Sequence, residues 1–193
     1  MKTICVFCGS SSGARPEYAE AAGQLGHLMA SSSICLVYGG GRVGLMGILA
    51  DSVLASGGKA VGVIPRALVD LEVAHTRLTQ IHVVGSMHER KALMADLADA
   101  FIMMPGGFGT WDEFCEIVTW SQLGIHQKPM GILNVLGYYD AFISMTARAV
   151  DDGFVRASHN NMVVIESDPE SLLSRLAVVS IPNEAKWITG PER

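Results

Sequence analysis

Six short runs of apolar residues, separated by segments with helical patterns, constrain the fold of this chain most strongly. These runs have the length of β-strands and cover Thr3 to Cys8, Ile34 to Tyr38, Lys59 to Ile64, Ala100 to Met104, Pro129 to Asn134 and Met162 to Ile165. They are apolar throughout rather than alternating, which is typical of strands covered on both faces. We therefore expect a single-domain α/β fold, a doubly wound, Rossmann-like parallel sheet with helices on both faces.

The predicted helices carry start and stop signals. Ser86 and Glu89 have the spacing of a capping box and predict that a helix begins there. Asp168 precedes a proline and predicts the start of the last helix, whereas Gly153 predicts the end of the helix over residues 140–152. These signals place helices between successive strands, as a doubly wound sheet requires.

The composition predicts a protein that acts on a small molecule. Of the 193 residues 49% are hydrophobic, which suffices for one domain over residues 1–179, followed by a polar tail over residues 180–193. The net charge of -5 and the pI near 5.6 argue against binding to nucleic acid or anionic membranes, since both need a basic surface. No apolar stretch reaches the roughly 18 residues of a membrane span, and none resembles a secretion signal, so we expect a cytoplasmic protein.

The cysteines and histidines do not indicate redox chemistry or a metal site. Four cysteines lie inside apolar segments, as reduced and buried cysteines usually do, namely Cys5, Cys8, Cys35 and Cys115. Cys5 and Cys8 have the spacing of a redox motif, but within a strand this spacing sends the two side chains to opposite faces. The six histidines lack the spacing of metal ligands, and we expect neither a metal nor a cofactor.

Three glycine-rich segments follow predicted strands, at the sheet edge where open α/β proteins bind their ligands. Glycine lets the backbone approach a ligand closely, and the amides of a first helical turn favour an anion such as phosphate. One such loop could serve packing alone, but three on one sheet favour ligand binding. The expected substrate-binding residues in these loops are Ser10, Gly40, Gly41, Gly106, Gly107, Phe108, Gly109 and Thr110.

The second loop also matches part of the dinucleotide-binding pattern. Gly39, Gly41 and Gly44 have the required spacing, but no acidic residue follows at the end of the next strand to hold a ribose hydroxyl. Arg66 could instead meet a 2′-phosphate. An NADP-dependent or flavin oxidoreductase is therefore kept as an alternative function.

A carboxylate-rich helix is expected after the third loop, and a basic pair opens the helix before it. At about 100° per residue, the predicted apolar face of the first helix holds Trp111, Phe114, Cys115 and Val118. Glu113 and Glu116 then lie opposite and need not be buried, and we expect both to contact the ligand, whereas Asp112 complements the helix dipole. Arg90 and Lys91 oppose the dipole of their own helix, so we expect an anion near them.

A longer motif resembles the LONELY GUY (LOG) family, whose signature is Pro-Gly-Gly-x-Gly-Thr-x-x-Glu. The motif consists of Arg90-Lys91 followed by Pro105-Gly106-Gly107-Phe108-Gly109-Thr110-Trp111-Asp112-Glu113. The resemblance extends to Cys8-Gly9-Ser10, Tyr38-Gly39-Gly40-Gly41, Trp120-Ser121-Gln122-Leu123-Gly124 and Asn134-Val135-Leu136-Gly137-Tyr138-Tyr139. The resemblance covers the chain except for its C-terminal tail.

This resemblance implies the activity of a cytokinin riboside 5′-monophosphate phosphoribohydrolase, which cleaves an N6-modified adenine from its ribose 5′-phosphate. It implies no metal or redox cofactor, and a homodimer as the usual assembly. It assigns catalysis to Arg90 and Glu113, and nucleotide contacts to Glu72, Lys91, Gly107 to Thr110 and Thr119. Family members are often labelled lysine decarboxylases, but nothing in the sequence indicates a pyridoxal phosphate site.

The residues themselves suggest how such a site would work. Loop amides and Ser10 would hold the 5′-phosphate while Glu113 faces the ribose, where N-glycoside cleavage builds positive charge. Arg90 would fix the ligand and offset charge on the departing base or phosphate. A non-catalytic nucleotide-binding or sensing protein is the alternative, although it would not require the carboxylate. The sequence does not distinguish AMP from a prenylated adenine nucleotide as substrate.

Overall fold

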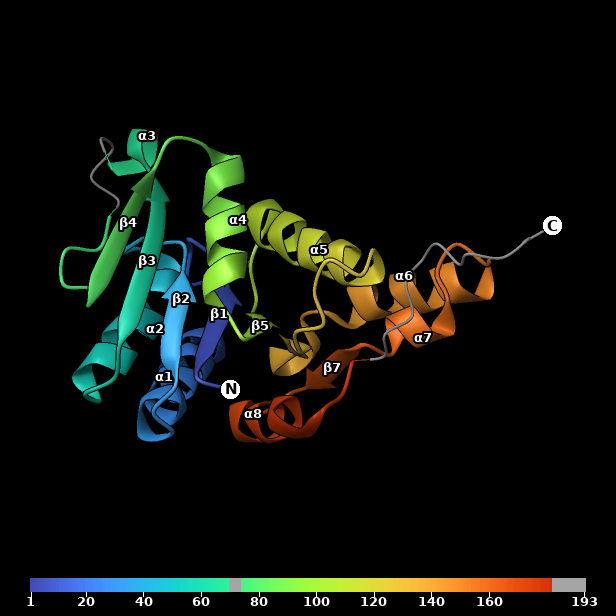
Figure 1. Ribbon diagram of the computed structural model, residues 1–193. Helices are drawn as coiled ribbons and strands as arrows, with labels where there is room; N and C mark the ends of the chain where they lie inside the picture. The colour runs from blue at the N-terminus through green and yellow to red at the C-terminus, as the bar shows by residue number, and fades with distance from the viewer. Residues whose placement is uncertain (70–73, 182–193) are drawn as a thin grey trace.

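A computed structural model describes residues 1–69 and 74–181 and contains a parallel sheet with helices on both sides (Figure 1). Within these residues the sheet has seven strands in the order β4-β3-β2-β1-β5-β6-β7, and all neighbouring strands run parallel. The strands are β1 (Thr3–Phe7), β2 (Cys35–Tyr38), β3 (Ala60–Pro65), β4 (Gln80–Val84), β5 (Ala100–Met103), β6 (Met130–Leu133) and β7 (Val163–Glu166). The expected doubly wound α/β fold is confirmed.

Helices α1, α2 and α8 cover one face of this sheet, and α4 and α5 cover the other. Their bounds, with those of the shorter elements, are α1 (Pro16–Ser31), α2 (Gly44–Ala55), α3 (Arg66–Val69), α4 (Met87–Leu97), α5 (Phe108–Gln122), the 3-10 helix η1 (Val135–Gly137), α6 (Asp140–Asp151), α7 (Ala157–Asn160) and α8 (Pro169–Val178). Side chains of β1 alternate between the two cores, Ile4 and Val6 on the first face and Phe7 on the second. This double burial explains why the central strands are apolar at every position.

The cysteine expectations hold in part. Cys5 lies in the core under α4 and α5, and Cys8 lies in the opposite core, so the predicted divergence of the pair is confirmed. Burial raises the pKa of the Cys8 thiol well above its ordinary value. Cys115 is exposed and Cys35 is half-buried, so burial was wrongly predicted for these two residues.

The predicted helix ends are confirmed in their main features. Ser86 Oγ accepts a hydrogen bond from the N–H of Glu89 at 3.1 Å, as in a capping box. The Glu89 carboxylate accepts from the N–H of Gly85 at 2.8 Å, one residue before the expected partner. Asp168 caps α8, and α6 ends just before Gly153, whose φ of 80° lies in the left-handed region.

The edge strand β4 was not predicted. Its sequence mixes polar and apolar residues, and Ile81 and Val83 are exposed, because an edge strand has a neighbour on one side only. The β4 segment therefore lacks the continuous apolar run that marks the six predicted strands.

The chain leaves the sheet centre in opposite directions from β1 and β5, and the three glycine-rich loops meet at this switch point. The N–H of Gly9 donates to the carbonyl of Pro105 at 3.0 Å, which joins the first loop to the third. Gly44, which opens α2, lies directly against the backbone of Ser10 and joins the second loop to the first. No helix among residues 1–69 and 74–181 is long and apolar enough to cross a membrane.

We expect Gly44→Ala to destabilise the protein more than Gly57→Ala does. Both glycines have positive φ, so alanine adds about 1–2 kcal/mol of backbone strain at either position. A Cβ on Gly44 would also collide with the backbone of Ser10 and Ser11, whereas the space around Gly57 is open. Overpacking at Gly44 adds roughly 1–3 kcal/mol. Urea unfolding of the two variants measures the difference, and equal losses would contradict the close contact of the loops.

Candidate active site

A cavity of about 590 Å³ opens at the switch point, at the carboxyl ends of β1, β2 and β5. All three glycine-rich loops line it, together with side chains from α4 and α5. The structure brings eight of the predicted site residues to this one cavity, and they are Ser10, Gly41, Arg90, Gly107, Phe108, Gly109, Thr110 and Glu113. Their meeting place is the sheet edge at which open α/β folds bind ligands.

A buried ion pair lies in the wall of this cavity. Arg90 Nη1 donates a hydrogen bond to Glu113 Oε1, and each residue is only 8% exposed. Arg90 Nε donates to the carbonyl of Val63 at 3.1 Å, which fixes the plane of the guanidinium. Burial raises the pKa of Glu113 above the ordinary value of a glutamate, while the charge of Arg90 opposes that shift.

The burial of Glu113 corrects the predicted faces of α5. The helix turns Thr110, Glu113, Phe114, Ile117 and Ser121 inward, and Cys115 is exposed. The prediction placed the glutamates opposite the apolar residues from their angular spacing on the helix. An isolated buried carboxylate would also be costly. Arg90 offsets the cost of burying Glu113, because it supplies the charge and the hydrogen bond that a buried carboxylate needs.

Lys91 turns to the acidic surface of α5. Its Nζ lies 2.7 Å from Asp112 Oδ2 and 3.2 Å from Glu116 Oε2. Burial lowers the pKa of Lys91, but its hydrogen bonds to the two carboxylates raise it, and the net shift is upward. Both cations that open α4 therefore face carboxylates of α5.

The other predicted site residues lie at the border of the cavity or away from it. Gly106 lines a smaller neighbouring pocket of about 300 Å³, where the Tyr138 hydroxyl donates to its carbonyl at 2.7 Å. Gly40 is buried behind the cavity wall. Thr119 lines a separate cavity of about 190 Å³ between α5, α6 and β7. Glu72 lies outside the described residues.

Apolar side chains that no sequence motif marked line another part of the cavity wall. They include Val43, Met46, Leu68 and Met87, and Phe108 projects at the cavity with 85% of its surface exposed. No sequence pattern marks such residues, because exposed apolar side chains are common on any protein surface. Among residues 1–69 and 74–181, no cluster of three or more His, Cys, Asp or Glu is arranged to hold a metal ion.

Comparison with known proteins gives close relatives along most of the chain. Residues 46–176 match a family model described as "Possible lysine decarboxylase". A probable cytokinin riboside 5′-monophosphate phosphoribohydrolase of Oryza sativa subsp. japonica is 49% identical over 91% of this chain and 77% of its own length. A cytokinin riboside 5′-monophosphate phosphoribohydrolase of Arabidopsis thaliana is 47% identical over 91% of this chain and 81% of its own length.

Solved structures share the fold at lower identity. A molybdenum cofactor binding protein from Rippkaea orientalis superimposes with a TM-score of 0.69 at 22% identity, covering 92% of this chain and 96% of that chain. The molybdenum cofactor carrier protein of Chlamydomonas reinhardtii gives a TM-score of 0.68 at 17% identity, covering 92% and 99%. At these identities the likeness concerns the fold alone.

Proposed function

This chain belongs to the LONELY GUY (LOG) family of phosphoribohydrolases, and from that premise we propose that it hydrolyses the N-glycosidic bond of N6-modified adenosine 5′-monophosphates. The products are the free adenine-type base, a cytokinin, and ribose 5-phosphate. The observation that carries the proposal is the Arg90–Glu113 ion pair in the wall of a cavity bordered by three glycine-rich loops. This arrangement combines an anion-binding surface with a carboxylate of raised pKa.

The phosphate is assigned to the loop that begins α5. The helix starts at Phe108, so the amides of Phe108, Gly109 and Thr110 belong to its first turn and have no helical partners of their own. These amides and the helix dipole favour an anion, and Ser10 adds a hydroxyl from the first loop. A nucleoside 5′-monophosphate bound in this way directs its ribose toward Glu113.

Glu113 is assigned to the developing charge on the sugar. Cleavage of the C1′–N9 bond leaves an oxocarbenium-like ribose, which an adjacent carboxylate stabilises. The same carboxylate orients or activates the water that attacks C1′. Arg90 holds that carboxylate in place and offsets negative charge on the departing base or on the phosphate. We also propose that the nucleotide contacts Lys91, Glu72, Glu116 and Thr119.

The cavity does not favour amino acid decarboxylation. A pyridoxal phosphate enzyme needs a lysine at the site to hold the cofactor as a Schiff base. None of the described lysines is among the residues that line the cavity, and Lys91 is engaged by Asp112 and Glu116. The described lining of the cavity therefore does not fit pyridoxal phosphate.

The proposal is tested with three compounds: isopentenyladenosine 5′-monophosphate, AMP, and isopentenyladenosine without the phosphate. The purified protein is incubated with each, without added metal, and the free base is separated from the intact compound by chromatography. We expect base to be released from the nucleotides and not from the nucleoside, because the phosphate loops hold the substrate. The ratio of the two nucleotide rates identifies the preferred substrate. Binding without release of base would favour the sensing alternative.

The proposal includes a homodimer formed through α6. This helix has no buried residue among Asp140–Asp151, and Met145 is 60% exposed. The neighbouring Phe154 is 84% exposed, and a mostly apolar cavity lies between α5, α6 and β7. Phe142 and Ile143 of this helix are only partly buried against the core, and an amphipathic helix whose apolar face is incompletely covered is typical of an interface. The free cysteines fit a reducing compartment, so the proposal also includes a cytoplasmic location.

We expect Met145→Glu to convert the dimer into a monomer, because each copy would bring a charge into the apolar contact. Light scattering coupled to gel filtration measures the mass. Val178→Glu is the matched control, since Val178 is equally apolar and 82% exposed but lies on α8. Loss of the dimer in the control alone, or a monomeric wild-type protein, would contradict the proposed interface.

A further inference from the structure

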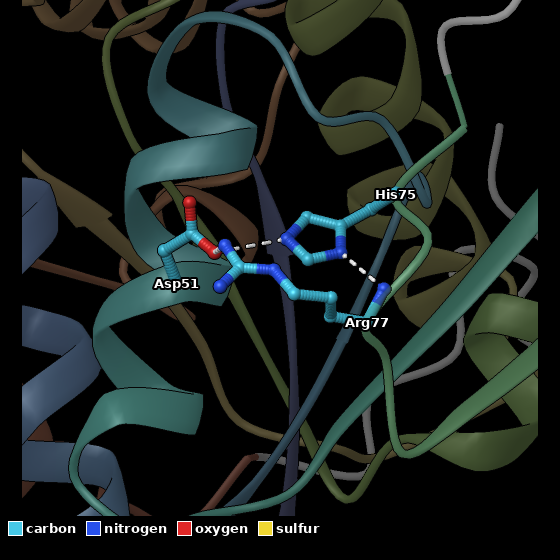
Figure 2. A network of polar contacts seen from close by, with 3 residues as sticks. All are labelled: Asp51, His75 and Arg77. Carbon is cyan, nitrogen blue, oxygen red and sulfur yellow. Dashed lines mark hydrogen bonds and ion pairs between the residues drawn. The ribbon is translucent and has the colours of Figure 1, made fainter.

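A polar network outside the cavity joins α2 to the segment that precedes β4 (Figure 2). His75 is buried, with 5% of its surface exposed, and its Nε2 lies 3.1 Å from Asp51 Oδ1 on α2. The Arg77 guanidinium lies 2.6 Å from the same Asp51 oxygen. The main-chain N–H of Arg77 donates to His75 Nδ1 at 3.1 Å. Both nitrogens of a buried imidazole are therefore engaged.

The hydrogen bonds assign the tautomer of His75. Because Nδ1 accepts a proton from the N–H of Arg77, the imidazole proton is on Nε2 and is donated to Asp51. The ring then has one donor and one acceptor, each with its partner. This arrangement fixes the ring orientation, and with it the main chain of the segment that carries His75.

That main chain is bonded to the second glycine-rich loop. The N–H of His75 donates to the carbonyl of Gly40 at 2.8 Å, and Ala74 forms an antiparallel bridge with Gly41. Gly40 has a φ of 73°, which glycine adopts without strain. The segment held by His75 thus supports the loop from behind.

The loop in turn borders the guanidinium of Arg90. Gly39 lies so close to this group that a Cβ at position 39 would collide with Arg90 Nη2. The guanidinium is therefore enclosed by the loop, by the carbonyl of Val63 and by Glu113. A shift of the loop would change both the cavity wall at Gly41 and the position of Arg90.

We propose that His75 is a positioning residue, which acts through the Gly39–Gly41 loop on nucleotide binding and on the orientation of Arg90. Asp51 holds the imidazole, the imidazole holds the segment of residues 74–77, and this segment holds the loop. The inference rests on the proposed function in so far as the ligand is a nucleoside 5′-monophosphate. The mechanical link between His75 and the loop stands apart from it.

The activity test compares His75→Leu with His126→Leu. His126 has the same local pattern, since its Nδ1 accepts from the N–H of Lys128 at 3.1 Å and its Nε2 lies 2.8 Å from the carbonyl of Ile117. It does not line the cavity. We expect His75→Leu to lower kcat/KM for isopentenyladenosine 5′-monophosphate about 10- to 100-fold, as small misplacements of a site do. We expect His126→Leu to keep kcat/KM near the wild-type value, even if its melting temperature falls as much as that of His75→Leu.

Two further variants keep the test decisive if His75→Leu does not fold. Asp51→Leu removes the anchor of the ring at a half-exposed position, and we expect it to lower kcat/KM in the same direction. Asp51→Asn keeps an oxygen that accepts a hydrogen bond from His75 Nε2. We expect this variant to keep most of the activity that Asp51→Leu loses. Equal kcat/KM values for Asp51→Leu and wild type would overturn the proposal.

Hydrogen–deuterium exchange separates this inference from the proposed function. We expect the peptide of residues 39–43 to exchange faster in His75→Leu and in Asp51→Leu, and at the wild-type rate in His126→Leu. If the wild-type protein does not hydrolyse nucleotides while this pattern appears, the proposed function fails and the positioning role stands. Unchanged exchange in both network variants would overturn the positioning role whatever the activity.

Discussion

Glu113→Gln lowers turnover of the nucleotide by about 10²–10⁴-fold, because the substitution removes the charge and the basicity of the group that faces the ribose. The amide oxygen of glutamine still accepts a hydrogen bond from Arg90, so the shape of the cavity is retained. Nucleotide binding therefore changes far less than kcat does. Steady-state kinetics on protein of verified melting temperature measures both values.

The control for this substitution is Asp112→Asn. Asp112 precedes Glu113 on α5 and also loses a carboxylate, but its side chain is exposed and bonded to Lys91. We expect its kcat to stay within about 10-fold of wild type, the range of a surface ion pair rather than of a reacting group. Near-normal turnover in Glu113→Gln, or an equal loss in Asp112→Asn, would reject the assignment of Glu113.

Arg90→Gln lowers kcat/KM by about 10²–10³-fold and moves the acid side of the pH profile to higher pH. Burial raises the pKa of Glu113, and the positive charge of Arg90 opposes that rise. Without the arginine the pKa rises further, so the carboxylate that the reaction needs is protonated at a higher pH. Activity is therefore lost earlier as the pH falls.

Profiles of kcat/KM against pH for wild type, Arg90→Gln and Arg90→Lys test this effect. Lysine keeps the charge but not the planar fork that bonds Glu113 and Val63, so we expect its acid limb to stay close to that of wild type while its rate falls. An acid limb that is identical in Arg90→Gln and wild type would contradict the electrostatic coupling of the pair.

The central part of the fold was accessible from the sequence because buried parallel strands consist of apolar residues throughout. Six strands and the principal helix ends follow from that pattern and from caps such as Ser86 and Asp168. The edge strand β4 was not predicted because its exposed positions interrupt the apolar run. The buried face of α5 was predicted incorrectly because it includes Glu113. A hydrophobic pattern assigns a charged residue to the exposed face of a helix.

Two local anomalies of the sequence explain each other in the structure. Arg90 is a cation at a helix N-terminus, where the helix dipole disfavours it. Glu113 is a carboxylate beside an anion-binding loop, where it would repel a bound phosphate. Their ion pair joins residues that lie far apart in the sequence, so the pattern predicted both residues but not their contact. His75 had no such anomaly. A single histidine without a motif acquires its role from Asp51 and Gly40, which only the folded chain brings near.

The products formed from isopentenyladenosine 5′-monophosphate test the central claim most directly. Equal concentrations of folded wild-type protein and Glu113→Gln are incubated with this nucleotide, and free base, ribose 5-phosphate, nucleoside and phosphate are quantified. Our account predicts base and ribose 5-phosphate in equal amounts from the wild-type protein, and a far smaller yield of both from the variant. Nucleoside with free phosphate, or equal yields from the two proteins, would contradict it.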